Sequence, residues 1–486
     1  MSRFQPLTAY TSVEQRYELL PFKFEPLGQR EVVLSNMVGE FAILSRNKLE
    51  ALVGHTLAAS DPDYGTLRAK HMLREPGEQA PIELLALKTR TKFSNKANFT
   101  NLHLFVVSLR CDHSCQYCQV SRQSEDKAKF DMSEETADKA LDIVFRSPNP
   151  AIKIEFQGGE PLLNWPLIKY VVEKAEARNK LEGRNLQFVI TTTLSLATDE
   201  MLEYCRDHLI FLSSSLDGPE DLHNKNRPRP GRDSYARFVD GLRRARDIIG
   251  YDAVSALMTT SPSSMTRVTD IIDEYVKLGF SGIFLRHLSP YGFALKTKSY
   301  QAYNAERWLE FFKEGLAYIL ELNKAGIAFV EQYSTILLTK MLTVRDPGFV
   351  DISNPCGAGI SAVVFNYDGD VYASDESRML HEMGDSTFRI GNLHQNTYEE
   401  IFTNEALLTA LEDSFTLSAP GCADCAVEPW CGADPVFHHG MTGDMLGRKP
   451  ESEFCKRQMG IAKHLLELMR TDPEAKGIFM NWVGGC

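Results

Sequence analysis

The sequence predicts an α/β protein: a partial (β/α)6 barrel with a small α+β module before it and a cysteine-rich domain after it. Three observations support this prediction. Between about residues 101 and 326, short apolar runs alternate with longer amphipathic ones, which is typical of parallel strands joined by crossover helices. Two short strand patterns precede this region, and six of the ten cysteines follow it. We therefore expect three domains, covering residues 1–95, 96–330 and 331–486.

The N-terminal module is predicted from two strands and two helical pieces. EVVLSN and EFAILS enclose a turn at MVG and predict a pair of strands. NKLEALVGHTL places Leu49, Leu52 and Leu57 at helical spacing, and TLRAKHML follows as a second helical piece. Because the module contains no cysteine, we expect it to be physically separate from the cysteine motifs.

The barrel is predicted from six apolar runs: LHLFVVSL, IKIEFQ, LQFVITT, IFLSSS, AVSALMT and GIFLRH. The amphipathic segments between them are SEETADKALDIVF, PLIKYVVEKAEA, TDEMLEYCRDH, SYARFVDGLRRARDII and RVTDIIDEYVKLG. Ser133 and Thr198 stand at two helix starts and are expected N-caps. Active sites of such barrels lie at the C-terminal ends of the strands, so the residues just after each strand are the candidate functional residues.

The last part of the chain is rich in loops. VVFNYDGDVYAS predicts a hairpin with an Asp-Gly turn, and KRQMGIAKHLLELMR predicts a closing helix. Four cysteines lie between Cys422 and Cys455. A domain with so few periodic segments needs an additional constraint, and a bound metal is the expected one.

Composition limits the class of protein. The 43% apolar and 24% charged residues are ordinary for a globular chain, and the net charge of −12 leaves no basic excess for a nucleic-acid backbone. The N-terminus lacks the apolar core of a signal peptide, and no stretch reaches 18 uncharged apolar residues. We expect a cytoplasmic protein without a nucleic-acid or membrane partner, whose clustered cysteines serve metal or redox chemistry.

The strongest functional signal is the segment Cys111-Asp-His-Ser-Cys115-Gln-Tyr-Cys118, directly after the first barrel strand. Three thiolates on one loop can ligate three irons of a cubane cluster and leave the fourth iron open for a ligand. The alternatives are a zinc knuckle, to which His113 could add a ligand, and thiols that bind nothing. The position at the end of a barrel strand favours the open cluster.

This CxxxCxxC loop resembles that of the radical S-adenosylmethionine (SAM) superfamily. Gln157-Gly158-Gly159-Glu160-Pro161 follows the second strand and resembles the GGE-type motif of that superfamily, which implies that it holds the methionine amino group of SAM. Glycines let the backbone approach a ligand, and a carboxylate pairs with an ammonium group. Taken alone, the segment could also be a simple turn.

Other positions agree with the resemblance. Tyr117 matches an aromatic position near the adenine. Ser215-Leu216-Asp217-Gly218-Pro219 resembles the SLDGP segment of the peptide-modifying branch, which implies a serine near the ribose, and Arg227 matches a recurring basic position. A helix cap and a surface arginine are the alternatives. Thr193 stands where many relatives have Asn, which leaves the ribose contact from the third strand open.

The C-terminal cysteines resemble the SPASM domain of peptide and protein maturases, which carries auxiliary iron–sulfur clusters. Cys422, Cys425, Cys431 and Cys455 fit the ligand set of one auxiliary cluster, with a structural zinc ion as the alternative. For a second cluster, Cys356 matches, but Ser374 and Asp434-Pro435 replace expected cysteines. Asp375, Asp434 or Cys486 could complete a mixed-ligand site, or Cys356 and Cys486 could be free thiols. We expect one auxiliary cluster rather than two.

Beyond these motifs, LPFKFEPLG, KIEFQGGEPLLN, SLDGPEDLHNKNRPRPG, FLRHLSPYGFA and WCGADPVFHHG together resemble the HxsB-type maturases of His-Xaa-Ser systems. The resemblance implies a precursor peptide with His-Xaa-Ser repeats and a second radical SAM maturase as partners. An electron donor such as flavodoxin or ferredoxin is also expected. The N-terminal module resembles, weakly, the PqqD-like leader-binding fold, whose strand edge pairs with an extended peptide; a plain packing domain is the alternative.

Together these observations predict an enzyme that reductively cleaves SAM and uses the resulting radical to modify a ribosomally made precursor peptide. The alternative within the enzymes is an anaerobic sulfatase maturase that forms formylglycine. The alternative outside them is a non-catalytic iron–sulfur electron carrier or scaffold. The general base and the bond formed on the precursor are not readable from the sequence.

Overall fold

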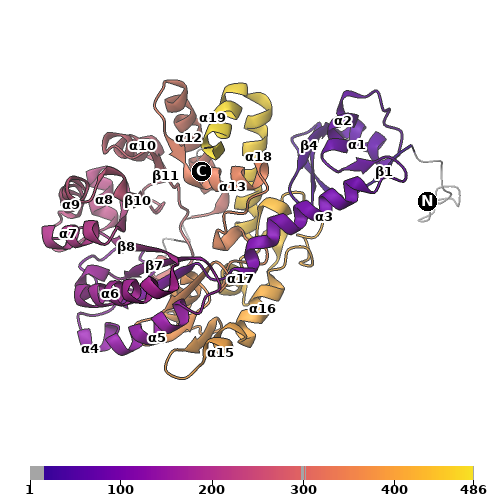
Figure 1. Cartoon of the computed structure of the whole chain (residues 1–486). Coiled ribbons are helices and arrows are strands. Elements are labelled where there is room, and N and C mark those ends of the chain that lie inside the picture. The colour runs from indigo at the N-terminus through magenta and orange to yellow at the C-terminus, as the bar shows by residue number, and fades with distance from the viewer. Residues whose placement is uncertain (1–15, 297–299, 301–302, 485–486) are drawn as a thin grey trace.

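A computed structural model describes residues 16–296, 300 and 303–484 (Figure 1). Its central sheet has eight strands in the order β10-β9-β8-β7-β6-β13-β14-β15. Five of these strands are parallel neighbours that coincide with the first five predicted barrel strands: β6 (Leu102–Ser108), β7 (Ala151–Gly158), β8 (Asn185–Thr192), β9 (Ile210–Ser215) and β10 (Val254–Leu257). The predicted α/β fold class is confirmed.

Helices lie outside these strands in Figure 1. They are α4 (Lys127–Phe130), α5 (Glu134–Val144), α6 (Trp165–Glu182), α7 (Asp199–Asp207), α8 (Glu220–Asn226), α9 (Ser234–Ile248) and α10 (Val268–Lys277). Both expected N-caps are present, because the Ser133 hydroxyl accepts from the Thr136 N–H at 3.1 Å and the Thr198 hydroxyl from the Met201 N–H at 3.3 Å. Capping of this kind satisfies N–H groups that have no partner within the helix.

The sixth barrel unit differs from the prediction. Its strand, β11 (Gly282–Ile283), is two residues long and pairs with β12 (Val330–Glu331) instead of β10. Just beyond it, the N–H of Arg286 bonds to the carbonyl of Phe284 at 2.7 Å. This local bond bends the chain, whereas the N–H groups of a strand ladder bond to the neighbouring strand. The Thr260 N–H still donates to the Arg286 carbonyl at 2.9 Å, so the chain after β10 and the chain after β11 are joined there by this backbone bond rather than by a strand ladder.

The C-terminal part continues the sheet of the barrel. Strand β13 (Ala362–Phe365) pairs parallel with β6 and antiparallel with β14 (Asp370–Tyr372), and β15 (Arg389–Asn392) follows. The predicted hairpin is confirmed, and Gly369 supplies the left-handed residue of its turn at φ +86°. Alternate residues of β6 face different cores: Phe105 and Val107 pack under the barrel helices, and Leu104 and Val106 pack with the hairpin. The domain boundary near residue 330 stays a prediction.

The remaining helices connect and cover these parts. They are α3 (Ala80–Phe93), α11 (Phe293–Lys296), α12 (Ala305–Lys324), α13 (Gln332–Leu342), α14 (Asp375–His381), α15 (Tyr398–Phe402), α16 (Glu405–Asp413), α17 (Pro435–Thr442), α18 (Glu453–Thr471) and α19 (Pro473–Gly484). Helix α18 confirms the predicted closing helix, and α19 follows it. Helix α3 was missed because its apolar residues do not form one buried face: Leu85 is buried, but Leu84 and Leu87 are exposed. No helix in the described ranges is both long and apolar enough to cross a membrane.

The N-terminal module consists of a three-stranded antiparallel sheet, a two-stranded pair and two helices. Its elements are β1 (Glu18–Leu19), β2 (Phe22–Leu27), β3 (Glu31–Asn36), β4 (Phe41–Ser45), β5 (Leu73–Arg74), α1 (Arg46–Val53) and α2 (Pro62–Ala69). Alternation along β3 places Val32 and Leu34 in the core of the module and Val33 in a second core with Trp430 and Leu466. Both faces of this strand are therefore buried, which explains the uninterrupted apolar run in EVVLSN.

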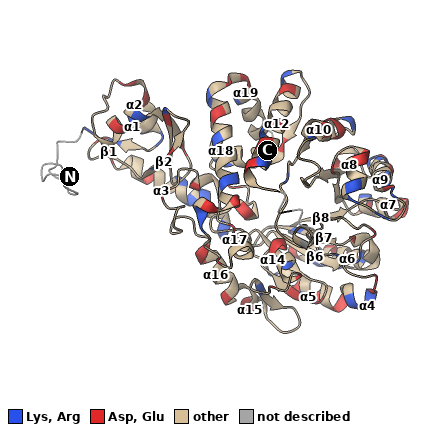
Figure 2. Cartoon of the chain, turned by 180° about the vertical axis from the view of Figure 1, so that it is seen from behind, with Lys and Arg blue, Asp and Glu red and all other residues tan. Residues whose placement is uncertain are grey.

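The expectation that this module is physically separate from the cysteine motifs is wrong. The Ser35 hydroxyl donates to the Ala426 carbonyl at 2.6 Å, and the Trp430 indole N–H donates to the Gly39 carbonyl at 3.0 Å. Ion pairs join Glu31 to Arg470 of α18 and Lys23 to Glu428. Figures 1 and 2 show the module beside α18 from opposite sides. The sheet of the module is thus packed against the chain that carries Cys422, Cys425 and Cys431.

We predict that Trp430→Ala lowers the free energy of unfolding by about 3–5 kcal/mol, because the indole is fully buried between the module and the C-terminal core. Denaturant unfolding of the variant and the parent protein measures this difference. Phe24→Ala is the control, since this side chain lies in the same module with 51% of its surface exposed. An equal loss for both variants would contradict the packing role of Trp430.

Candidate functional site

The three cysteines predicted to hold the open cluster lie on one loop after β6. Cys111, Cys115 and Cys118 are each half-buried. Burial raises the pKa of the Cys115 thiol to about 12, and the neighbouring Cys118 adds to that shift. Burial also raises the pKa of Cys111, with smaller contributions from Glu160 and Cys115. The three thiols lie within eight residues of one loop, as the predicted shared cluster requires.

The GGE turn packs directly on this loop. The N–H groups of Gly159 and Glu160 donate to the carbonyls of Ser108 and Arg110, both at 2.8 Å. A Cβ on Gly159 would lie 2.2 Å from the Arg110 carbonyl oxygen, and one on Gly158 would lie 1.9 Å from that of Ser108. The sequence interpretation attributed these glycines to a ligand. In the structure the chain's own backbone already requires both of them.

Glu160 is fully buried, and burial raises its pKa. Its carboxylate accepts from the Thr192 hydroxyl at 2.7 Å, from the Thr193 N–H and hydroxyl at 2.9 and 2.8 Å, and from the Leu162 N–H at 3.1 Å. A carboxylate has about four acceptor positions. An ammonium group of SAM would therefore share or displace one of these donors, and the assignment of Glu160 to that group stays a prediction.

Asp112, which the sequence analysis did not single out, links the cysteine loop to this network. Its carboxylate accepts from the Ser195 hydroxyl at 2.6 Å, and the Ser195 hydroxyl lies 2.9 Å from that of Thr193. The ring of His113 lies 2.7 Å from the other Asp112 oxygen. Thr193 was noted only as a departure from the expected Asn. In the structure Thr193 links Glu160 to the cysteine loop. Its polar side chain was the signal from which the sequence analysis could have identified this role.

Three further predicted residues lie together under the same loop. Asp217 is fully buried, accepts from the Tyr117 hydroxyl and receives the Arg227 guanidinium at 3.1 Å. The guanidinium also lies 5.6 Å from the centre of the Tyr117 ring. Arg227 is therefore not the surface arginine of the alternative interpretation. Ser215 ends β9 in register with Leu257 of β10, so all four positions lie at the C-terminal edge of the sheet.

The zinc alternative for the loop also has a structural basis. Cys111, Asp112 and His113 offer three ligand atoms within 4.8 Å of one another. In this arrangement the Nδ1 of His113 already contacts Asp112, and Cys115 and Cys118 take no part. Metal analysis separates this alternative from the cluster.

The second group of cysteines surrounds a small cavity of about 30 Å³. Cys422, Cys425, Cys431 and Cys455 line it together with Lys449. Burial raises the pKa of the Cys431 thiol, and the charges of the other three thiols raise it further. The four predicted ligands therefore converge on one space, and thiolates are the ligands that an iron–sulfur cluster or a zinc ion takes.

The ligand set of a second auxiliary cluster is not assembled among the described residues. Ser374 caps α14, and Asp434 caps α17 by accepting from the Phe437 N–H at 2.9 Å. Asp375 accepts from Gln157 at 3.0 Å. Cys356 is buried, and Cys486 lies outside the described residues. The residues that replace the expected cysteines thus have helix-capping and hydrogen-bonding roles.

Comparison with known proteins identifies the central part of the chain. Residues 105–273 match the Radical SAM superfamily. This chain contains a radical SAM domain. The match includes the Cys111 loop, the GGE turn and the SLDGP segment, which lie at the ends of β6, β7 and β9. The radical SAM domain therefore covers about a third of the chain.

Curated relatives extend the radical SAM similarity. The serine-type anaerobic sulfatase-maturating enzyme of Bacteroides thetaiotaomicron is 24% identical over 326 residues, which cover 62% of this chain and 73% of that protein. The radical SAM cyclopropyl synthase TigE of Paramaledivibacter caminithermalis is 26% identical over 167 residues. That match covers 32% of this chain and only 34% of TigE.

Solved structures share the radical SAM fold. The structure of anSMEcpe with bound AdoMet has a TM-score of 0.63 at 17% identity and covers 79% of this chain and 100% of that chain. SuiB of Streptococcus suis with its precursor peptide SuiA has a TM-score of 0.50 at 14% identity, with coverage of 86% and 95%. The family match and the AdoMet-bound neighbour indicate an enzyme with a [4Fe–4S] cluster and SAM as cofactors.

We predict that Gly159→Ala lowers stability by about 1–3 kcal/mol or more even without SAM, because the added methyl meets the Arg110 carbonyl oxygen at 2.2 Å. Denaturant unfolding measures the change. Gly65→Ala in α2 is the matched control, since a Cβ there meets nothing within 4 Å, and alanine favours a helix. Unchanged stability of Gly159→Ala would mean that the glycine serves only to admit a ligand.

Proposed function

We propose that this enzyme modifies a ribosomally synthesised precursor peptide, of the His-Xaa-Ser type that the sequence resemblance implies. The observation that supports it best is the convergence of the Cys111 loop, the GGE turn and the SLDGP segment at the ends of adjacent parallel strands. A cavity of about 880 Å³ includes Gln157, directly before the GGE turn, in its wall. This volume lies within the range of ligand pockets.

In this proposal each motif has one role. Cys111, Cys115 and Cys118 hold the [4Fe–4S] cluster, and Cys422, Cys425, Cys431 and Cys455 hold one auxiliary cluster. The residues that bind SAM are Tyr117, Gly158, Gly159, Glu160, Ser215, Asp217 and Arg227. When bound, the cluster and SAM together supply a carbon radical that can take a hydrogen atom from the substrate.

The contribution of the chain is to fix the site and keep water out. Arg110, directly before Cys111, donates to both oxygens of Asp131 at 2.8 and 2.7 Å, and a bidentate pair of this kind fixes orientation. The Ser195 hydroxyl donates to Asp112 of the loop and the Thr193 hydroxyl donates to Glu160 of the GGE turn, and the two hydroxyls lie side by side. Asp217 and Tyr117 are buried and Arg227 is partly buried beside them, so reactive groups held there are shielded from solvent.

The proposed partners follow from the same features. SuiB is bound to its precursor peptide SuiA in one solved structure, and the N-terminal module here presents β2 and β4 as sheet edges. We propose that an extended leader segment pairs with one of these edges. A second radical SAM maturase and a flavodoxin or ferredoxin electron donor complete the proposal, and the cytoplasmic location stays a prediction.

A second candidate is sulfatase maturation. Relatives with that name match 62% of this chain. The family resemblance implies that sulfatase maturases have two auxiliary clusters, which argues against this candidate. In this chain Ser374 and Asp434, which stand where cysteines of the second cluster are expected, are helix caps. The products separate the two: a sulfatase peptide would gain formylglycine, and a precursor peptide would carry another mass change.

We predict that co-expression with a candidate precursor encoded nearby changes the mass of that precursor, measured by mass spectrometry. The change should be absent when Cys111, Cys115 and Cys118 are replaced together by Ala, and 5′-deoxyadenosine should no longer form with dithionite. Cys205→Ala is the control, because this buried thiol lies in α7 away from both groups. Formation of 5′-deoxyadenosine by the triple variant would refute the ligand assignment.

We also predict about eight irons per chain after anaerobic reconstitution, four for each of two clusters. The reason is that the structure assembles one further set of four thiols, around Cys431. Iron and zinc analysis of the same sample measures this. About twelve irons would indicate a second auxiliary cluster, and one zinc ion with about four irons would support the zinc alternative for the C-terminal site.

A further inference from the structure

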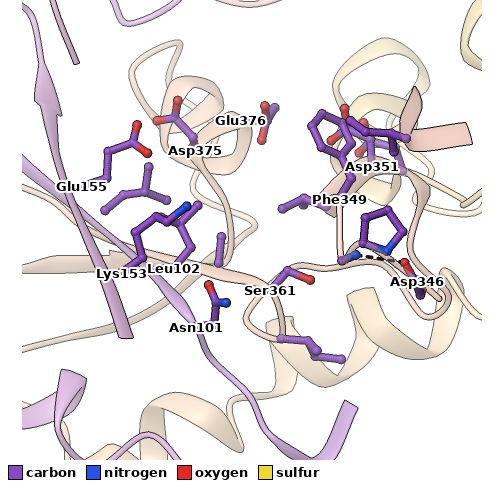
Figure 3. Close-up of a pocket in the computed structure, with 18 of the residues that line it drawn as sticks. Asn101, Leu102, Lys153, Glu155, Asp346, Phe349, Asp351, Ser361, Asp375 and Glu376 are labelled. Carbon is purple, nitrogen blue, oxygen red and sulfur yellow. Dashed lines mark hydrogen bonds between the residues drawn. The ribbon is translucent and has the colours of Figure 1, made fainter. Parts of the chain in front are cut away.

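The large cavity runs along the barrel strands, from the starts of β6 and β7 to Gln157 and Thr191 near the ends of β7 and β8. Figure 3 shows Glu155, Asp375, Glu376 and Asp351 around one part of this space, with Lys153 and Asn101 elsewhere on its wall. Six Asp or Glu residues and four Lys or Arg residues line the cavity. Its wall therefore carries an excess of acidic groups.

Several of the charged groups already have partners. Asp346 pairs with Lys96 at 3.5 Å, and the Lys92 ammonium donates to the Pro429 carbonyl at 2.8 Å. Glu155 accepts from the Thr191 hydroxyl at 2.9 Å, and Asp375 accepts from Gln157. Asp375 also pairs with Arg378 at 3.4 Å, so Asp351, Glu376, Asp434 and Glu155 are the acidic wall residues without an ion pair in the described ranges.

Asp351 and Glu376 receive no side-chain hydrogen bond and no ion pair from another residue in the described ranges. Asp434 uses one oxygen to cap α17. Burial raises the pKa of all three carboxyls, and the charges of neighbouring carboxylates add to the effect. Arg286 acts in the opposite direction on Asp351 and Glu376, the buried Arg457 does so on Asp351 and Asp434, and Lys449 does so on Asp434. Of these three cations, Arg286 is the one that lines the cavity, against three carboxylates on its wall.

The hydroxyl of Tyr291 is a second, independent sign of a missing ligand. Tyr291 lines the same cavity with 1% of its surface exposed, and its buried hydroxyl has no hydrogen-bond partner within the described part of the chain. After burial, the charges of Asp434, Glu376 and Asp351 are the largest influences on it. Buried polar groups without a partner are rare in folded proteins, so this group points to a ligand that supplies one.

We propose that Asp351, Glu376, Asp434 and Tyr291 form a subsite for a cationic side chain of the substrate peptide. This rests on the proposed function, since it takes the cavity as the place where the peptide binds. A guanidinium or ammonium group brings several N–H donors, which carboxylates and a hydroxyl oxygen can accept. It would also pair buried charges that are costly when left alone.

A bound metal ion would be a different occupant, and the spacing does not favour it. Among the residues that the structure describes, the group of three potential metal ligands within 4.8 Å of one another is Cys111, Asp112 and His113. The carboxylates of Asp351, Glu376 and Asp434 do not form such a group. Oxygen ligands of one calcium or magnesium ion lie at 2.0–2.6 Å from it, which requires a tighter cluster than this one.

The experiment uses the full chain, reconstituted anaerobically, and compares two small probes by NMR titration. Acetyl-arginine amide carries the cation, and acetyl-citrulline amide is its neutral isostere. We expect the arginine probe to bind about tenfold more tightly or better, as hydrogen bonds to charged groups allow. Glu376→Gln and Asp351→Asn should each bring this ratio close to one. Tyr291→Phe should lower it by a smaller factor, because only one acceptor is lost.

The variants are expected to fold, because an amide of the same shape replaces an unpaired buried carboxylate. Glu412→Gln, on an exposed position of α16, is the matched control and should leave the ratio unchanged. Equal affinity of the two probes for the parent protein would overturn the proposal. Tight binding of Mn²⁺ that Glu376→Gln abolishes would replace it with a metal site.

This readout depends neither on SAM cleavage nor on a precursor. Failure of the proposed reaction would therefore leave the probe discrimination interpretable, and the two proposals can fail separately. Charge discrimination without peptide modification would keep the subsite and remove the proposed reaction. Peptide modification without charge discrimination would keep the proposed reaction and remove the subsite.

Discussion

The close approach of two backbone segments organises the candidate site. Gly158 and Gly159 at the end of β7 lie against the carbonyls of Ser108 and Arg110 at the end of β6. No side chain fits between them, so the GGE turn and the start of the cysteine loop are held at a fixed distance. Glu160 then reaches the end of β8 through Thr192 and Thr193. Three strand ends are joined by this one contact.

The parts of the chain are less independent than their sequence patterns indicate. Strand β13 adds to the barrel sheet at β6, and the N-terminal module packs on the loop that carries Cys425 and Cys431. The module and the chain that carries these two cysteines therefore share one core. Buried Lys449, which faces the four thiols and has no hydrogen-bond partner in the described part of the chain, adds a positive charge to that environment.

The cavity beside the GGE turn gives the proposed enzyme a means to select its substrate. The cysteine positions expected for a second auxiliary cluster are occupied by Ser374 and Pro435, and the neighbouring Glu376 and Asp434 face the cavity. Carboxylates in this place repel an anionic cluster and attract a cation.

The sequence by itself determined the elements with strong local signals. Apolar periodicity located β6 to β10 and their helices, Ser133 and Thr198 marked two helix starts, and the cysteine spacing identified both groups of thiols. Motifs of this kind depend on residues close in the chain. Arg227 and Asp217 were found because their segment has a recognisable pattern, although their ion pair needed the fold.

Features that depend on contacts between distant parts of the chain could be found only in the tertiary structure. The docking of Val33 on Trp430 and the contacts that bring Asp112 and Glu160 together through Ser195 and Thr193 join segments separated by tens to hundreds of residues. A one-dimensional pattern shows that a residue is apolar or charged, and not which residue satisfies it. The sixth strand is present but shorter than the predicted run, and its pairing with β12 could not be read from the sequence.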